Sequence, residues 1–166
     1  MFDIYIFFDI ISTNIVLGDK MEEVIIYTDG ACSCNPGPGG WGAVLMLNNA
    51  KKEISGYVEN TTNNAMEMTA IIEALSLLKR KCIVKVHSDS AYIVNAYNQQ
   101  WIKKWKTNNW KTSGKDPVKN RELWEKLDSL IQEHEVTFVK VKGHSTDVWN
   151  NRCDELATGE IKKNIK

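Results

Sequence analysis

The sequence predicts an α/β fold in which one mixed five-stranded sheet carries helices on both faces. Three β-rich segments follow one another closely early in the chain, a pattern typical of an antiparallel meander. An apolar helical segment then leads to a fourth strand, and parallel pairing of two strands requires such a long crossover. Further helices and a fifth strand follow toward the C-terminus. The expected order of elements is therefore βββαβααβα.

β-rich runs and the turns between them mark the first three strands. Residues 24–27 (VIIY) form a continuous apolar run, as expected of a strand buried on both faces, and Asp29-Gly30 ends it. Residues 35–40 (NPGPGG) are dense in turn-forming residues, and residues 48–52 form a polar turn. The three strands are expected over 24–27, 41–47 and 53–58.

The longest helical pattern follows residues 61–64 (TTNN) and is expected to continue to about Arg80. Met66, Ala70 and Ala74 belong to an apolar stripe at helical spacing, which favours a helix packed on the sheet. The remaining elements are expected to be a strand over 83–87, a short helix over 91–97, an amphipathic helix over 120–134, a strand over 136–141 and a helix from Asn150 onward.

Length and composition indicate one globular domain. The chain has 166 residues, of which 43% are hydrophobic and 25% are charged, and its net charge is zero. No global field therefore directs it to nucleic acid or to a membrane. Its four cysteines contain no CxxC pair, which argues against a zinc site and predicts free thiols in the reducing cytoplasm.

The first twenty residues differ from the rest of the chain. They are apolar, but Asp3 and Asp9 interrupt them and no basic residue precedes the apolar stretch. They match neither a secretory signal nor a membrane span. We predict that residues 21–166 form the functional domain, and that residues 1–20 are either an artefact of an upstream start or an N-terminal extension.

Four carboxylates occupy positions where a charge is unexpected. Asp29 and Asp89 each follow an apolar strand, Glu67 falls on the apolar face of the long helix, and Asp154 shares a helix face with apolar residues. Carboxyl ends of parallel strands gather ligands, so we expect Asp29 and Asp89 to lie close together. Converging carboxylates repel one another unless a cation lies between them. Oxygen ligands without thiolates suit Mg²⁺ or Mn²⁺, and this predicts metal-assisted phosphoryl chemistry.

Each carboxylate also has a plain structural alternative. Asp29 could belong to an Asp-Gly turn, and Asp89 could begin a helix. Glu67 could complete a capping box with Asn64, and Asp154 could be a first-turn residue that favours the helix dipole. The combination of the four is more informative than any one of them.

Two further features concern function. His144 lies in a polar loop between the last strand and the last helix; such a histidine is usually solvated and idle, but near carboxylates and metal it could shuttle protons. Between Trp101 and Arg121 there are six lysines and one arginine against one acid, with Trp101, Trp105 and Trp110 interleaved. Lysines can contact phosphates while indole rings lie against sugars and bases. Alternatively, the tryptophans anchor a small satellite core and the lysines solvate it.

Several motifs together resemble the bacterial type 1 ribonuclease H family. They read YTDGACSCNPGPGGWG, TTNNAMEM, HSDSAY, QWIKKWKTNNWKT, DPVKNRELW and VKGHSTDVWNNRCDELA, and the resemblance extends from about Met21 to Thr158. It implies an endonuclease that hydrolyses the RNA strand of RNA–DNA hybrids and leaves 5′-phosphate and 3′-hydroxyl ends. It also implies two Mg²⁺ ions, with Mn²⁺ able to substitute. Apart from the resemblance, no membrane partner is expected, and a monomer is the default because the sequence gives no sign of oligomerisation.

The resemblance assigns roles by motif. Asp29, Glu67, Asp89 and Asp154 would hold the metals, with Asp29 bridging both, and His144 matches an auxiliary catalytic histidine. Residues 101–115, called the basic protrusion below, match a segment that grips the DNA strand. The positions that match substrate contacts are Cys32, Asn35, Asn63, Asn64, Trp101, Trp105, Lys106, Trp110 and Asn120.

The chain departs from the family pattern at two places. Ala65 stands where bacterial relatives often have arginine, and residues 147–151 (DVWNN) replace a segment in which His-Pro and Glu are commoner. Two alternatives stay open: a hybrid-binding module without catalysis, and a DNA-directed nuclease or strand-transfer enzyme on the same fold. All four acids are present, which argues against the first, and the basic protrusion and TTNN segment argue against the second.

Overall fold

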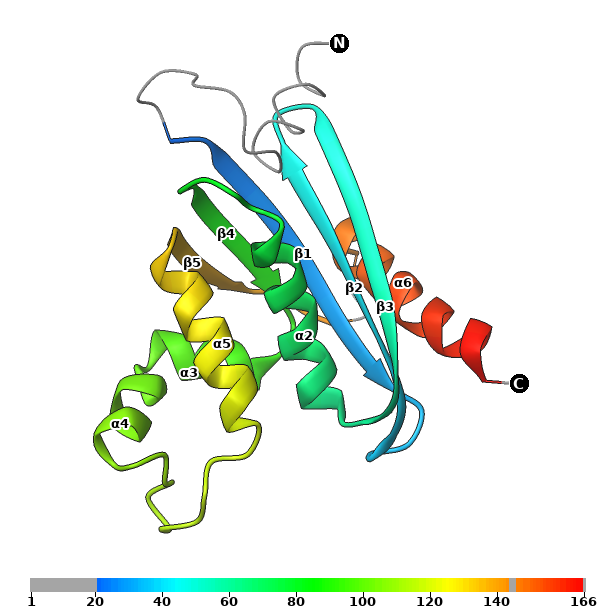
Figure 1. Ribbon diagram of the computed structural model, residues 1–166. Helices are drawn as coiled ribbons and strands as arrows, with labels where there is room; N and C mark the ends of the chain where they lie inside the picture. The colour runs from blue at the N-terminus through cyan, green and yellow to red at the C-terminus, as the bar shows by residue number, and fades with distance from the viewer. Residues whose placement is uncertain (1–20, 144–145, 166) are drawn as a thin grey trace.

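A computed structural model describes residues 21–143 and 146–165 (Figure 1). The strands are β1 (Glu23–Cys32), β2 (Gly37–Leu47), β3 (Ala50–Thr61), β4 (Ile83–Ser88) and β5 (Glu135–Lys140). The helices are α2 (Asn63–Ser76), α3 (Ala91–Asn98), α4 (Trp101–Thr107), α5 (Arg121–Gln132) and α6 (Val148–Asn164).

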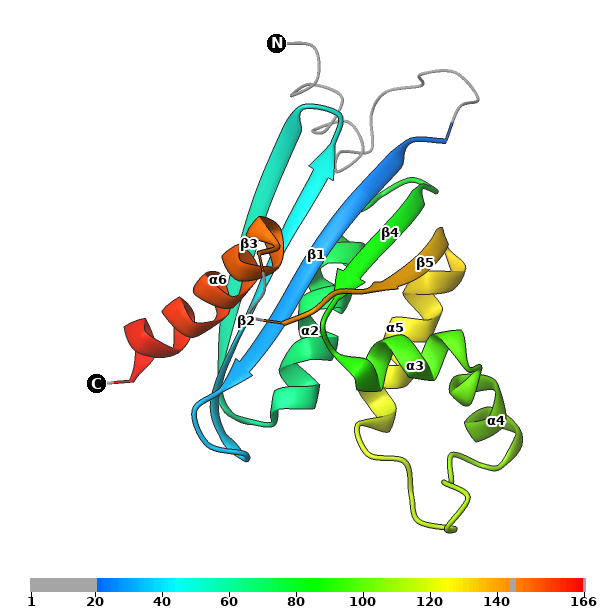
Figure 2. The same ribbon diagram turned by 180° about the vertical axis from the view of Figure 1, so that it is seen from behind.

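One mixed sheet with the strand order β3-β2-β1-β4-β5 organises the molecule. The antiparallel meander β1-β2-β3 forms one side, and β4 and β5 are added parallel to β1. Helices α2, α3 and α5 cover one face, while α6 lies across β1, β2 and β3 on the other (Figure 2). The predicted α/β fold with helices on both faces is confirmed.

The main core lies between the sheet and the helices α2, α3 and α5. Alternate residues of the central strands, including Val24, Ile26 and Val86, are fully buried there. Ile71 and Leu75 of α2 pack against them. Met66, Ala70 and Ala74 are also buried, which confirms the predicted apolar stripe. Burial of these side chains fixes α2 over β1, and that position is important for the site described below.

Several predicted boundaries were wrong. The three meander strands extend beyond the predicted runs because their ladder hydrogen bonds continue through glycine-rich and polar residues. Helix α2 ends at Ser76 rather than near Arg80. Just after Ser76, the backbone N–H groups of Leu77 and Leu78 donate to carbonyls only three residues back, which closes the last turn. Helix α6 begins at Val148, because the Asp147 carboxylate accepts from Trp149 N and Asn150 N.

Helix α4 was missing from the predicted order, which becomes βββαβαααβα. Figure 1 shows α4 and the loop after it projecting from the body of the molecule next to α3 and α5. None of the helices in the described part of the chain is long and apolar enough to cross a membrane.

Candidate active site

Asp29 and Asp89 lie next to each other where the parallel ladder between β1 and β4 ends. The last pair of that ladder is Thr28 and Ser88, and each aspartate is the following residue. Strand β1 continues past Asp29 against β2, where Asp29 pairs with Gly42. The Asp-Gly turn interpretation is therefore wrong, whereas the predicted convergence of the two aspartates at this end of the strands is observed.

The helix-start interpretation of Asp89 is also wrong. Helix α3 is capped by Ser90, whose hydroxyl oxygen accepts a hydrogen bond from Ile93 N at 3.5 Å. Asp89 precedes this cap, and its carboxylate is not needed to begin the helix.

Glu67 is buried, with 5% of its surface exposed, and it faces the sheet from α2. The helix cap is Thr62, whose hydroxyl accepts from Ala65 N at 3.3 Å, so Glu67 lies in the second turn and the capping-box interpretation is wrong. Close contact with β1 sets the position of Glu67. A Cβ added to Gly30 would lie 2.2 Å from Glu67 N, so only a residue without a side chain lets α2 lie this close.

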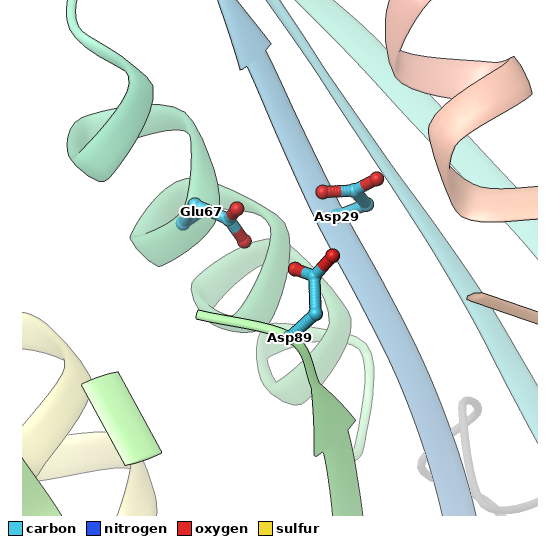
Figure 3. Close-up of side chains that lie close together, drawn as sticks. All are labelled: Asp29, Glu67 and Asp89. Carbon is cyan, nitrogen blue, oxygen red and sulfur yellow. The ribbon is translucent and has the colours of Figure 1, made fainter. Parts of the chain in front are cut away.

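The three carboxylates of Asp29, Glu67 and Asp89 form one cluster, called the carboxylate cluster below. Each offers an oxygen, and these oxygens all lie within 4.8 Å of one another. Figure 3 shows the three side chains pointing toward one another from α2, from β1 and from the end of β4. The Glu67 Oε2 atom is buried without a hydrogen-bond partner among the described residues. A buried, unpartnered oxygen beside two more carboxylates is suited to bind a cation.

Burial and mutual repulsion make these groups hard to ionise. Burial, followed by the charge of Asp89, raises the pKa of Asp29 from 3.8 to about 7. Burial, followed by the charge of Asp29, raises the pKa of Glu67 well above its usual range. A bound divalent cation would reverse both effects because it favours the ionised form.

Asp154 is not part of the carboxylate cluster, but its charge acts on Asp29. It stands in the second turn of α6, half-buried, and its charge raises the pKa of Asp29. The first turn of α6 holds no acid, so the helix-dipole interpretation is wrong. Among the described residues, the group whose oxygens lie within 4.8 Å of one another does not include Asp154. His144 lies outside the described residues.

A groove beside α2 brings together several predicted substrate contacts. Asn35, Asn64, Trp105 and Asn120 all line this groove, whose volume is about 610 Å³. Asn120 begins α5 with a positive φ of 57°, and its side chain makes no cap hydrogen bond.

Cys32 and Asn63 are not among the residues that line this groove, but hydrogen bonds connect them to residues at or next to it. The Asn35 Oδ1 atom accepts from Asn63 N at 3.2 Å, which connects the 33–36 loop to the start of α2. The thiol of Cys32 donates to the carbonyl oxygens of Gly37 and Thr61, each at 3.4 Å. These hydrogen bonds keep the 33–36 loop next to the start of α2.

Some residues of the basic protrusion line grooves, and others pack into the core. Trp101 and Trp105 line a second groove of about 440 Å³ together with Lys104 and Lys111. Trp110 is only 8% exposed and belongs to the core, with the Arg121 guanidinium 5.4 Å from its ring centre. The Lys106 ammonium pairs with Asp128 instead of lining either groove. The packing alternative thus describes Trp110 best, whereas Trp101 and Trp105 both pack against the core and line a groove.

Comparison with known proteins decides the family. The RNase H family model matches residues 21–162. The chain belongs to the ribonuclease H family. Among its relatives, the ribonuclease H of Acetivibrio thermocellus is 59% identical over 146 residues, which cover 88% of this chain and 99% of that protein. The ribonuclease H of Caldicellulosiruptor saccharolyticus is 61% identical over 143 residues, which cover 86% and 99%. The predicted family is confirmed, and the protein is a nuclease.

Solved structures of ribonucleases H agree with this assignment. LC11-RNase H1, isolated from compost, is 30% identical with a TM-score of 0.67, and the match covers 88% of this chain and 100% of that one. The same enzyme in complex with an RNA/DNA hybrid is 29% identical with a TM-score of 0.64, and that match covers 86% and 99%. Ribonucleases H depend on a metal, and the carboxylate cluster could bind one.

Some residues at the site escaped prediction from the sequence. Tyr92 lines the larger groove from α3, and no periodicity singles it out. Lys140, at the end of β5, donates to the backbone carbonyl of Asp89. This contact depends on the pairing of β4 with β5, which a linear pattern does not encode. Lys104 and Lys111 belong to the lysine count of the basic protrusion, so composition had found them as a group.

Proposed function

We propose that this ribonuclease H hydrolyses the RNA strand of RNA–DNA hybrids, using two divalent cations, and leaves 5′-phosphate and 3′-hydroxyl ends. The observation that carries the proposal is the convergence of Asp29, Glu67 and Asp89 at one end of the parallel strands in a chain of this family. Mg²⁺ is the proposed cation and Mn²⁺ is expected to substitute, because both prefer oxygen ligands.

The carboxylates have different proposed roles. Asp29 has an oxygen within 4.8 Å of oxygens of Glu67 and Asp89, and the charge of Asp154 acts on it from α6, so it is the residue proposed to bridge both cations. Glu67, Asp89 and Asp154 would complete the ligand set from three other elements. When bound, the cations would activate water and stabilise the leaving 3′-oxygen. No protein nucleophile is then required, and His144 is proposed to assist proton movement.

The grooves would hold the hybrid. Asn35, Asn63 and Asn64 carry short polar groups that suit contacts to the 2′-hydroxyls of an RNA strand in a wide minor groove. Cys32 and Asn120 border the same surface. The lysines of the basic protrusion, together with Trp101 and Trp105, are proposed to contact the DNA strand. Trp110 would support this surface by packing into the core beneath it, and Lys106 by its ion pair with Asp128.

A cleavage assay tests the proposal. Labelled RNA–DNA hybrid, duplex RNA and duplex DNA are incubated with the protein, with Mg²⁺ or with a chelator. We expect cleavage of the RNA strand of the hybrid alone, and only with Mg²⁺. Cleavage of duplex DNA at a similar rate, or unchanged cleavage of the hybrid in chelator, would contradict the proposal.

Asp29→Asn separates catalysis from binding. It keeps the shape of the side chain but removes the central charge, so we expect cleavage to fall by at least about 10²–10³-fold, the loss typical for removal of one catalytic electrostatic group. Hybrid binding measured by fluorescence anisotropy should change little. Full cleavage by this variant would refute the role of Asp29.

Three further parts of the proposal concern the molecule as a whole. Residues 21–166 are proposed to form the ribonuclease H domain, a range close to the 21–162 matched by the family model. The protein is proposed to act in the cytoplasm, where the four free cysteines would stay reduced. A monomer is also proposed, and light scattering after size-exclusion chromatography would check it.

A further inference from the structure

The end of β5 and the residues after it lie close to both the backbone and the carboxylate of Asp89. Ser88 pairs with Lys140 in the ladder between β4 and β5, and Val141 N donates to the Ser88 carbonyl at 3.1 Å. This register carries the Lys140 ammonium to the Asp89 carbonyl oxygen, to which it donates a hydrogen bond. At the carboxylate, a Cβ added to Gly143 would lie 2.4 Å from Asp89 Oδ2.

Lys140 therefore brings a positive charge to the carboxylate cluster. Burial and the charges of Asp29 and Asp89 raise the pKa of Glu67, and the charge of Lys140 acts in the opposite direction by favouring the ionised form. Lys140 thus acts on Asp89 through a hydrogen bond and on Glu67 through space. An ammonium at this place partly offsets the repulsion that three converging carboxylates produce.

We propose that Lys140 is a built-in counter-ion of the carboxylate cluster and that it sets the affinity for divalent cations by competing with them electrostatically. The inference depends on the proposed binding of divalent cations by this cluster. Lys140 is a positioning residue here, because it acts through Asp89 and Glu67 rather than on the substrate. Removal of its charge leaves the acidic site more negative, so a divalent cation should bind more tightly.

The chain offers a matched control in Lys79. Its ammonium also donates to a backbone carbonyl, that of Ser76, at 2.8 Å, and it is exposed. Lys79 precedes β4, whereas the carboxylate cluster lies beyond the other end of that strand. Lys79→Met removes the same charge and the same kind of hydrogen bond far from the site.

Mg²⁺ titration of the metal-free protein, followed through amide NMR shifts at low ionic strength, tests the inference. We expect the Kd for Mg²⁺ to fall about three- to tenfold in Lys140→Met, the range expected for the loss of one solvent-screened charge near the site. Lys140→Arg, which keeps the charge, and Lys79→Met should both stay within about twofold of the wild-type value.

An unchanged or higher Kd in Lys140→Met would overturn the inference while the proposed metal site stands. An equal fall in Lys79→Met would overturn it as well, because the effect would then reflect net charge alone. Failure of the wild-type protein to bind Mg²⁺ would overturn both the inference and the proposed metal role.

Discussion

At the scale of single residues, Glu67 shows how this molecule gives up stability for function. Its carboxylate is almost completely buried, one of its oxygens has no partner among the described residues, and two aspartates lie beside it. In a metal-free protein each of these features opposes folding. A protein selected only for stability would place an apolar or amide side chain here.

Replacement of Glu67 by Gln should therefore stabilise the metal-free protein. The amide has the same shape but no charge, so it avoids the cost of an ionised carboxylate in a buried place, and we expect the free energy of unfolding to rise at pH 8. Hybrid cleavage should be lost. Urea unfolding in chelator measures the change in stability.

Glu73 provides the control on the same helix. It is half-buried and lies outside the carboxylate cluster, so Glu73→Gln should alter the free energy of unfolding by less than about 0.5 kcal/mol, as substitutions away from buried charge networks usually do. A Glu67→Gln protein no more stable than Glu73→Gln would mean that Glu67 carries no electrostatic strain.

At the scale of elements, helix faces were easier to predict than helix ends. The spacing of Glu67 with the apolar residues of α2 predicted correctly that it faces the sheet. The sequence offered several possible caps in TTNN, and the pattern did not select Thr62 among them. Helix α4 has no side-chain cap and begins after Gln100 at a φ of 56°, so it lacks the usual start signal. It is held by tertiary contacts such as that of Trp105 with Trp124, whose ring centres are 5.4 Å apart.

The contact between α2 and β1 at Gly30 predicts the effect of a single methyl group. In Gly30→Ala the new Cβ would meet backbone atoms of Met66 and Glu67 that cannot rotate away, so α2 must shift from β1. We expect a loss of about 1 to 3 kcal/mol in the free energy of unfolding, as for other overpacked sites. Mg²⁺ binding should weaken too, because Glu67 moves with the helix.

Gly159 supplies the opposite case in α6. Apart from the backbone of α6 itself, no atom of the described residues lies within 4 Å of a Cβ added there, so Gly159→Ala should stabilise the protein by about 0.5 to 1 kcal/mol through helix propensity alone. Thermal unfolding of both variants measures the contrast. Equal melting temperatures for Gly30→Ala and the wild-type protein would rule out the tight contact.

At the scale of the whole molecule, the sequence predicted the strand ends and the helix face that bring Asp29, Asp89 and Glu67 together. It could not predict how near Asp154 would come, because that depends on the packing of α6 on the sheet. The contact of Lys140 with Asp89 and the groove that collects Asn35, Asn64 and Asn120 also depend on tertiary structure. Helical and strand periodicity relates residues within one element only, so the spacing of residues in the sequence does not reveal contacts between elements far apart in the chain.

The raised pKa values predict how stability depends on pH. The pKa of Asp29 rises from 3.8 to about 7 on folding and that of Glu67 also rises, so the folded metal-free protein binds more protons than the unfolded chain. Their stabilising contribution is present below about pH 4 and is lost as the pH rises toward 7. Asp29→Asn cannot titrate, so its stability advantage over the wild-type protein should grow over this range by on the order of 3 kcal/mol.

Urea unfolding of both proteins from pH 4 to 8 in chelator measures this difference. Burial chiefly lowers the pKa values of His87 and His134, so these histidines make stability rise with pH. Both proteins contain them, so their contribution cancels in the comparison. Saturating Mg²⁺ should remove the advantage of the variant, because the cation stabilises the ionised carboxylates. A difference that stays constant with pH would contradict the raised pKa of Asp29.

The proposed domain boundary gives a simple prediction for the first twenty residues. A chain that begins at Met21 should fold, keep its melting temperature within about 2 °C, a shift equivalent to roughly 0.5 kcal/mol or less, and cleave the hybrid at the same rate. Circular dichroism and the cleavage assay check both points. Failure of the shortened chain to fold would show that residues 1–20 belong to the domain.

Anomalous diffraction from crystals grown with Mn²⁺ and a hybrid blocked at the cleavage site would locate the cations themselves. We expect two manganese peaks about 4 Å apart, the spacing typical of two-metal sites, with Asp29 in contact with both. Glu67, Asp89 and Asp154 should each contact at least one. No peak at these carboxylates, or peaks that leave Asp29 unligated, would contradict two-cation catalysis by this cluster.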